Sequence, residues 1–297
     1  MRVLIVGLGD IARKAYLPVL TALPELEVHL ATRNRAVLDL IGAEYRIEHR
    51  YTSLVDALAS ASFDAAFVHA ATSAHPAMVE ALLARGIPVL VDKPLADNLD
   101  DAARLIDLAV RSNTLLAVGF NRRFAPDYAA LRDLPRSLVL MQKHRRASPD
   151  EARRVIFDDF IHVADTLRWL APAAIERQHI ETVNRGGLLE SVTVALAGEG
   201  YHAIGTMHRG SGLDEERLDI LGGDARRSVI NLAERVDVDG GVSRTRRGDW
   251  TPVGRQRGFE AMCADFLIGV REGRQVAAED LLATHELCER IVVQASL

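Results

Sequence analysis

A glycine pattern near the start of the chain constrains the fold more than any other feature of the sequence. Residues 3–6 form a short apolar, mostly β-branched run that predicts a strand buried on both faces. Gly7, Gly9 and Ala12 follow at the spacing G-x-G-x-x-A, and a run with helical spacing comes next. The first glycine permits a sharp turn, the second lets a pyrophosphate approach the backbone, and the alanine lets the helix pack closely on the strand. The pattern predicts a dinucleotide site at a helix N-terminus, with these contact residues: Gly7, Gly9, Asp10, Ile11 and Ala12.

The size and composition of the chain limit the class of protein. Its 297 residues suffice for two domains with packed cores. The net charge of −5, with no long run of one sign, argues against a nucleic-acid partner held by bulk electrostatics. The two cysteines, Cys263 and Cys288, have no metal-binding spacing and fit a reducing compartment. No apolar run reaches the roughly 18 residues that span a bilayer, and the chain begins directly with a strand. We expect a cytoplasmic protein without a signal peptide or a membrane partner.

Predicted strands and helices alternate through the first 120 residues. The strands are residues 3–6, 26–31, 64–70, 87–91 and 115–118. Strands separated by helices imply right-handed crossovers, so the expected fold is an α/β, Rossmann-type doubly wound parallel sheet. Ligands of such sheets bind beyond the carboxyl ends of the strands. Polar side chains that follow strand ends should converge there as cofactor contacts: Arg33, Thr72, His75, Lys93 and Asn121.

The residue after the second strand indicates which cofactor the site accepts. A carboxylate there binds the ribose 2′-hydroxyl of NAD, whereas an arginine accommodates the 2′-phosphate of NADP. The carboxylate is missing and Arg33 takes the position, with Arg35 close by. The sequence therefore favours NADP, with NAD possible; the alternative is a solvated arginine that stacks on adenine and is compatible with either cofactor.

The pattern changes near residue 124. Seven strand-like runs follow with short glycine-bearing turns, which predicts an α+β domain with a large, mostly antiparallel open sheet. One helix lies within this half, and two more, residues 258–272 and 279–294, close the chain. We expect a dinucleotide-binding domain over residues 1–122 and a substrate and oligomerisation domain over 123–275. We expect residues 276–297 to pack back on the first domain.

Two groups of residues are candidates for the chemistry. Lys93 emerges from a buried strand and precedes Pro94, which restricts its backbone; an ammonium there can stabilise a developing alkoxide, although most lysines on such loops are only solvated. Asp158, His162 and Asp165 share one stripe of the later helix, where a carboxylate can orient an imidazole that exchanges protons. The other interpretations are a surface hydrogen bond, or a two-histidine metal site with His144. We expect no metal, because nothing else in the chain has ligand spacing.

A basic group flanks the domain junction. Its members, taken as substrate-binding candidates together with Asp165, are Arg122, Arg123, Lys143 and His144. Such a group favours a small polar substrate that is polyhydroxylated or carboxylated, and the alternative is a solvated cationic edge.

Taken in order, four motifs resemble the Gfo/Idh/MocA oxidoreductase family. They are the N-terminal G-x-G-x-x-A, the tripeptide Asp92-Lys93-Pro94, residues 119–124 (GFNRRF) and the later D-x-x-x-H, and their detail is most similar to the MviM branch. The resemblance implies a Rossmann domain with an open-sheet domain, NAD(P), and homodimers or homotetramers built through that sheet. It also implies that Lys93, Asp158 and His162 are the catalytic residues.

Two positions depart from the family pattern. Asp92 replaces the usual glutamate, which alters how its loop is held, and Phe160 replaces a common glycine, which narrows the pocket. The resulting prediction is an NAD(P)-dependent oxidoreductase that moves a hydride between nicotinamide and a secondary alcohol or ketone of a sugar or cyclitol derivative. The alternatives are an NAD(P)-sensing regulator without activity and an imine or enone reductase.

Overall fold

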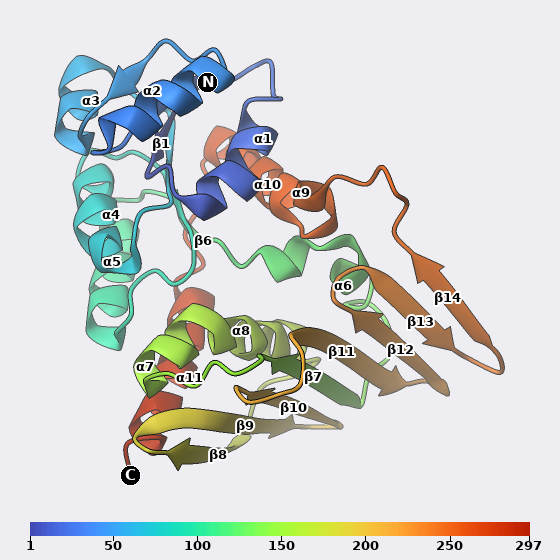
Figure 1. The fold of residues 1–297 in the computed structure, drawn as a ribbon. Helices are drawn as coiled ribbons and strands as arrows, with labels where there is room; N and C mark the ends of the chain where they lie inside the picture. Colours follow the sequence, from blue (N-terminus) through green and yellow to red (C-terminus); the bar gives the residue numbers. More distant parts are fainter. The chain divides into compact units, whose positions relative to one another are not determined.

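The computed structural model describes residues 1–297 and divides them into two compact units (Figure 1). The first unit comprises Met1–Gly119 and Phe259–Leu282, and the second comprises Phe120–Gly258 and Ala283–Leu297. The predicted second domain extends to residue 275, whereas residues 259–282 belong to the first unit and residues 283–297 to the second.

The first unit is built on a parallel sheet of six strands in the order β3-β2-β1-β4-β5-β6. The strands are β1 (Arg2–Val6), β2 (Glu27–Ala31), β3 (Arg50–Tyr51), β4 (Ala65–Val68), β5 (Val89–Val91) and β6 (Leu116–Val118). β4 and β5 are buried along their whole length, as is β1 from Val3 on, because helices cover both faces. The strand order is that of a doubly wound nucleotide-binding sheet, so the predicted α/β class is confirmed.

Eight helical segments lie wholly in the first unit, and three of them begin at a capping side chain. The segments are η1 (Ala12–Tyr16), α1 (Leu17–Leu20), α2 (Arg35–Glu44), α3 (Leu54–Ser60), η2 (Thr72–Ala74), α4 (His75–Leu83), α5 (Leu99–Arg111) and α10 (Phe259–Glu272). Asn34, Ser53 and Asn98 each accept a hydrogen bond from a backbone N–H in the first turn of α2, α3 and α5. These caps fix where each helix starts relative to the strand before it.

α10 belongs to the first unit although the sequence assigned it to the second domain. Phe259 meets Tyr16 edge-on with ring centroids 5.1 Å apart, and Phe266 meets Phe67 in the same way at 5.3 Å. The following helix, α11 (Ala278–Gln294), is divided between the units after Leu282. An apolar stripe shows that a helix is buried, but it does not show which neighbour buries it.

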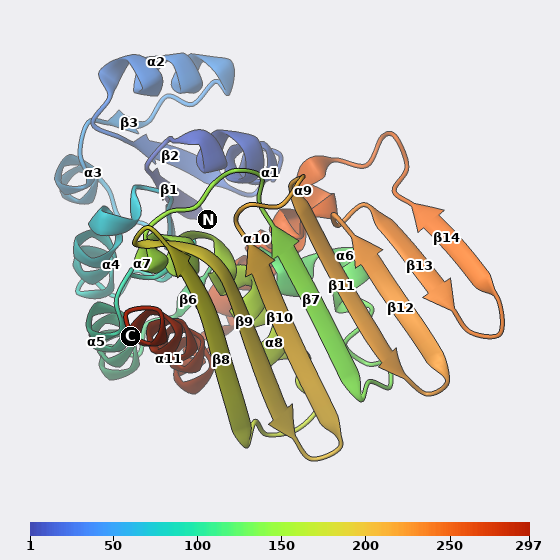
Figure 2. The same cartoon turned by 60° about the horizontal axis from the view of Figure 1, so that its bottom comes forward.

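The second unit is built on an eight-stranded sheet in the order β14-β13-β12-β11-β7-β10-β9-β8, which Figure 2 shows from its broad side. The strands are β7 (Leu138–His144), β8 (Arg177–Arg185), β9 (Leu188–Gly198), β10 (Tyr201–His208), β11 (Glu215–Gly222), β12 (Ala225–Ile230), β13 (Glu234–Val238) and β14 (Val242–Arg246). Every pairing is antiparallel except that of β7 with β10. The predicted mostly antiparallel open sheet is therefore confirmed.

Helices cover one face of this sheet. They are η3 (Asn121–Phe124), α6 (Pro126–Ala129), α7 (Ala152–Val155), the π-helical turn η4 (Ile156–Phe160), α8 (Ile161–Leu170) and α9 (Val253–Gln256), with the later part of α11. β7 alternates between buried and half-buried residues, as expected for a strand with one covered face. α8 packs closely on β10 at Gly205, where a Cβ would lie only 2.4 Å from Val163 Cγ1.

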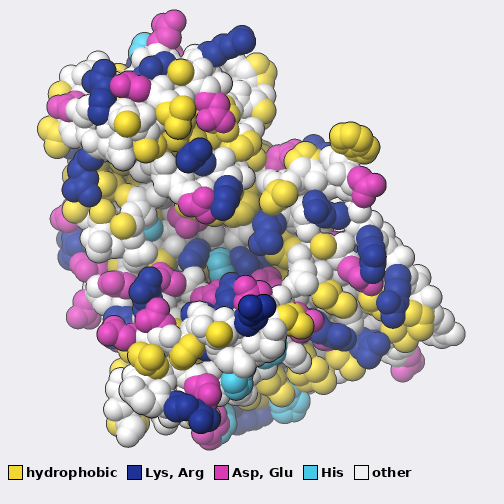
Figure 3. Space-filling view, viewed as in Figure 1, with side chains coloured by type: hydrophobic (Ala, Val, Ile, Leu, Met, Phe, Trp, Pro, Cys, Tyr) yellow, Lys and Arg dark blue, Asp and Glu magenta, His cyan; other side chains and the backbone are white.

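The outer surface offers no membrane-spanning element. No helix is both long enough and apolar enough to cross a bilayer. On the face of the first unit drawn in Figure 3, basic and acidic side chains are interspersed. This face therefore carries no large area of a single charge.

Candidate active site

The glycine turn after β1 has the geometry that a dinucleotide phosphate site needs. Gly7 adopts φ +87°, and a Cβ on it would lie 2.6 Å from the backbone nitrogen of Ala70, so no other residue fits. Nothing lies within 4 Å of the position that a Cβ on Gly9 would take, so the backbone there is uncovered. Ala12 is fully buried in the first turn of the helix that begins at this turn of the chain. An uncovered backbone at a helix N-terminus fits a pyrophosphate.

The end of β2 presents an arginine to solvent. Arg33 is exposed and takes part in no hydrogen bond or ion pair within the protein. The next residue, Asn34, caps α2, and Arg35 pairs with Asp39 at 3.0 Å. Of the two arginines, only Arg33 keeps its guanidinium uncommitted.

His75 connects two loops instead of pointing a nitrogen at a ligand. Its Nδ1 lies 2.8 Å from the carbonyl oxygen of Pro94, and its Nε2 lies 3.0 Å from that of Ala70. The ring is buried. His75 therefore ties the loop after β4, which contains Thr72 at the start of η2, to the loop that carries the half-buried Lys93.

Asp92, the residue that replaces the family glutamate, is held by Tyr16. The Tyr16 hydroxyl donates to Asp92 Oδ1 at 2.9 Å, and Tyr16 stacks on His69 at 3.8 Å between ring centroids. Burial raises the pKa of Asp92, although Lys93 and the tyrosine hydroxyl oppose this. Burial also lowers the pKa of His69 to about 3, so this ring is neutral. The carboxyl group before Lys93 is thus held by the Tyr16 hydroxyl, and the stacking on His69 holds the tyrosine ring.

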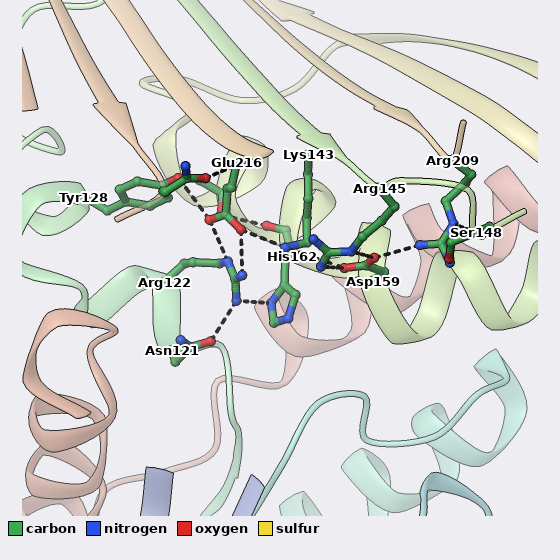
Figure 4. Close-up of polar contacts among 12 residues, drawn as sticks. Asn121, Arg122, Tyr128, Lys143, Arg145, Ser148, Asp159, His162, Arg209 and Glu216 are labelled. Atoms are coloured by element: carbon green, nitrogen blue, oxygen red, sulfur yellow. Dashed lines mark hydrogen bonds and ion pairs between the residues drawn. The ribbon is translucent and has the colours of Figure 1, made fainter. Parts of the chain in front are cut away.

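In the second unit, a buried carboxylate joins two strands, β7 and β11, to two short helical segments, η3 and α6 (Figure 4). Glu216 accepts two hydrogen bonds from Arg122, at 3.0 and 2.7 Å, one from Lys143 at 2.8 Å and one from the Tyr128 hydroxyl at 3.1 Å. Burial alone would raise the pKa of Glu216, but Arg122 and Lys143 hold it well below its usual value. Burial lowers the pKa of Lys143 to about 8.

A second carboxylate continues this network along the sheet. Asp159 accepts from Arg145 at 2.7 and 2.8 Å and from Arg209 at 2.8 Å, and it lies 3.5 Å from the ammonium of Lys143. The cationic cluster, as we call this network, has four cations and two carboxylates. Its members are Arg122, Lys143, Arg145, Arg209, Glu216 and Asp159. It therefore carries two excess positive charges.

His162 joins the cluster through Arg122. Arg122 Nη1 lies 2.8 Å from His162 Nδ1 in the buried interior, and the imidazole is 9% exposed. Asp158, its predicted partner, lies on η4 with its side chain half exposed and 3.7 Å from Arg154. The role of Asp158 stays a prediction.

The remaining candidates are distributed over the same unit. Arg123 makes a bidentate pair with Asp165, which is buried on α8. His144 lies on β7, where its Nδ1 accepts from the backbone N–H of His208. The structure therefore brings together Arg122, Lys143 and His162 but places Arg123–Asp165 and His144 in separate contacts.

Sequence reasoning missed the acidic half of the cluster. Glu216 lies directly opposite Lys143 in the β7–β11 register, and Asp159 lies next to the residue that was chosen. The alternation along β11 could have shown that Glu216 faces inward, but only the strand pairing reveals its partner.

One further group of potential metal ligands lies in the first unit. Oε1 of Glu27 is 2.8 Å from His29 Nε2 and 3.7 Å from His49 Nε2. The two imidazoles are stacked, with centroids 4.1 Å apart and planes within 7°. Because a metal lies in the plane of each ring that binds it, two parallel stacked rings cannot share one ion in this arrangement.

The sheet order, the uncovered glycine turn and the open second sheet together define a Rossmann-type unit joined to a unit with an open sheet. Residues 1–120 match the model of the oxidoreductase family with that fold, GFO_IDH_MocA, and residues 126–238 match the YceM-like C-terminal domain. The chain belongs to the Gfo/Idh/MocA oxidoreductase family.

Named relatives agree with this assignment. The chain is 36% identical to the putative oxidoreductase YceM of Salmonella typhimurium, over 90% of this chain and 88% of that protein. The crystal structure of the dehydrogenase MviM from Clostridium difficile superposes with a TM-score of 0.91 and 31% identity, covering 99% of both chains. The myo-inositol dehydrogenase Hyg17 of Streptomyces leeuwenhoekii is 34% identical over 63% of this chain and 61% of its own length. The predicted resemblance to the MviM branch is confirmed.

Proposed function

We propose that the protein is an NADP-dependent dehydrogenase that interconverts a secondary alcohol and a ketone on a sugar or cyclitol derivative. The observation that carries the proposal is the uncovered backbone at Gly9 together with an uncommitted arginine, and no carboxylate, after β2. Similarity to a myo-inositol dehydrogenase supports the substrate class.

The proposed cofactor contacts lie in the first unit. The turn Gly7–Ala12 would hold the pyrophosphate and Arg33 the 2′-phosphate, through a charge-assisted hydrogen bond. The nicotinamide, when bound, supplies or accepts the hydride. Thr72 and Lys93 follow strand ends and are proposed to contact the cofactor, whereas His75 acts on their two loops through its bonds to Pro94 and Ala70.

Lys93 and His162 are the proposed catalytic residues. An ammonium or amine at Lys93 suits the stabilisation and transfer of charge at the substrate oxygen. His162 is held by the cationic cluster, whose two excess positive charges favour a substrate rich in hydroxyl or carboxylate oxygens. Asp158 is the proposed orienting residue, by resemblance to the family.

A cofactor and substrate screen tests the proposal. NADPH and NADH binding would be titrated by fluorescence, and oxidation of the reduced cofactor followed against keto-inositols, keto-sugars, sugar acids, imines and enones. We expect NADPH to be preferred and a ketose-type or cyclitol-type ketone to be reduced. Binding of a nucleotide without turnover of any compound would favour the regulator, and turnover of imines or enones alone would favour that reductase.

Two substitutions assign the residues. Arg33→Ala should weaken NADPH binding about 10- to 100-fold, the value of one charge-assisted hydrogen bond, and leave NADH unchanged. Arg35→Ala is the matched control, because Arg35 already pairs with Asp39. Lys93→Ala should abolish most turnover while NADPH still binds; equal turnover contradicts the assignment.

We also propose a homodimer or homotetramer formed through the open sheet of the second unit. The uncovered face of this sheet is half-buried and mixed in character, with Leu140, Thr193, Ile204 and Thr206 on neighbouring central strands. Sedimentation of the wild type against a Thr206→Arg variant tests this: an unchanged, monomeric mass for both contradicts it.

A further inference from the structure

The hydrogen bonds of the Arg122 guanidinium fix its orientation. Its Nε and Nη2 donate to the two oxygens of Glu216, at 3.0 and 2.7 Å. Its Nη1 has two hydrogens and two partners, Asn121 Oδ1 at 3.1 Å and His162 Nδ1 at 2.8 Å. A guanidinium only donates. Because two of its nitrogens are fixed on one carboxylate, the third is aimed by the same planar geometry.

The orientation of the Asn121 amide shows which group accepts one of the two hydrogens on Arg122 Nη1. Asn121 Nδ2 donates to the carbonyl oxygen of Arg257 at 2.7 Å, so its Oδ1 must face Arg122. One hydrogen of Nη1 therefore points to an oxygen that accepts it. The other points to the ring nitrogen of His162.

This contact determines which nitrogen of His162 carries the proton. A nitrogen that faces an N–H donor at 2.8 Å must present its lone pair, so Nδ1 of His162 is unprotonated. The proton of the neutral ring then lies on Nε2. A proton on Nδ1 would point an N–H at another N–H, and a ring protonated on both nitrogens would also place two cations in direct contact.

The other charged groups of the cluster pair with one another. Figure 4 shows Lys143 from β7, Glu216 from β11 and Asp159 from η4 near His162. Lys143 lies 2.8 Å from Glu216 and 3.5 Å from Asp159, so these groups pair with one another. Both carboxylates are further engaged by arginines.

We infer that Arg122 is a positioning residue that fixes His162 as the Nε2–H tautomer, so that His162 donates a hydrogen bond to the substrate oxygen and does not accept its proton. The part of this inference that concerns the substrate rests on the proposed dehydrogenase; the tautomer does not. A ring whose Nε2 already carries hydrogen cannot take the hydroxyl proton in alcohol oxidation. That proton must pass to another group, for which Lys93 is the proposed acceptor.

The tautomer can be read directly. In long-range ¹H–¹⁵N correlation spectra of the full-length protein labelled with [¹⁵N]histidine, the unprotonated ring nitrogen resonates far from the protonated one. His162→Gln identifies the ring signals of His162 because they disappear from its spectrum. The matched control is His179→Gln, since His179 is an exposed histidine on β8. At pH 7 we expect Nε2 protonated and Nδ1 unprotonated. Protonation at Nδ1, alone or with Nε2, overturns the inference.

Arg122→Lys tests the cause. A lysine ammonium keeps the charge beside Glu216 but has no planar fork that also reaches His162. The two ring nitrogens of His162 should then exchange between the neutral tautomers, so their signals should average. An unchanged Nε2–H signal shows that Arg122 does not fix the ring. If this variant does not fold, the wild-type spectrum still decides the tautomer.

The kinetic consequence separates a hydrogen-bond donor from a base. A glutamine amide can donate from about the position of Nε2, but it cannot accept a proton. We expect His162→Ala to lower kcat about 10²- to 10³-fold, as the loss of one oxyanion donor does. His162→Gln should recover most of that loss and keep the wild-type pH profile. Equal loss in both variants, with one limb of the pH profile missing, identifies His162 as the base.

The outcomes of these tests are distinguishable. If no carbonyl compound is turned over, the proposed function fails and the spectra still report the tautomer. If the enzyme is active but Nδ1 carries the proton, the proposed function stands and this inference fails.

Discussion

Glu216 allows the energetics of the cationic cluster to be tested with a single substitution. Glu216→Gln keeps the shape of the side chain but removes the charge that Arg122 and Lys143 contact at 2.7 and 2.8 Å. At an effective dielectric constant of about 20, each of these attractions is roughly 6 kcal/mol, and desolvation of the ions offsets much of it. The net loss for breaking a buried pair from one side is about 3–5 kcal/mol.

The matched control is the neighbouring glutamate. Glu215 is half-buried on the opposite face of β11, and its side chain makes no hydrogen bond or ion pair. Glu215→Gln should change the free energy of unfolding by less than about 0.5 kcal/mol. Glu216→Gln should lower the midpoint of thermal unfolding by about 6–20 °C for a unit of this size.

Urea and thermal unfolding, followed by circular dichroism, compare the two variants with the wild type. If Glu216→Gln loses no more stability than Glu215→Gln, the carboxylate does not hold the cluster together. The hydrogen bonds that Glu216 accepts from Arg122 and Tyr128 would then contribute little to the free energy of unfolding.

Three further predictions concern the turn, the buried lysine and the thiols. Gly7→Ala should destabilise the protein and abolish NADPH binding because its Cβ meets the backbone of Ala70, whereas Gly9→Ala should melt like the wild type and bind NADPH more weakly. The folded pKa of Lys143, about 8, is below its unfolded value of 10.5, so the folded protein binds fewer protons and stability rises with pH between these values. Urea unfolding of the wild type relative to Lys143→Met should show a gain in the free energy of unfolding of up to about 3 kcal/mol over this range. A difference that does not depend on pH contradicts the lowered pKa. Burial raises the pKa values of Cys263 and Cys288, so neither thiol should react with DTNB until urea unfolds the protein. Because the unfolded thiols ionise first, the free energy of unfolding should begin to fall as the pH rises above their unfolded pKa of about 8.5. Rapid reaction of the native protein with DTNB contradicts this burial.

Local signals in the sequence predicted most of the first unit. The caps at Ser53 and Asn98, the apolar runs and the glycine pattern act within a few residues of where they stand in the chain. β14 was missed because its residues are all exposed and show no apolar alternation.

The site was predicted less completely because it depends on contacts between distant segments. Lys143 and Glu216 meet through a strand pairing that spans 73 residues. The spacing argument for Asp158 assumed a regular helix, but η4 is a π-helical turn, which changes the direction of the side chains that precede α8. Asp159, which the sequence did not single out, reaches the cluster, and the role of Asp158 stays a prediction.

The position of β7 has a consequence for synthesis on the ribosome. Its Leu138 pairs with His202 on one side and Leu221 on the other, so this central strand is made long before either neighbour. At about 5–20 residues per second, residues 139–202 take roughly 3–13 s to appear. During that time β7 is a nascent strand with two open edges, and β8 and β9 can pair with each other first. Completion of the second unit then requires insertion of an older segment between two younger ones.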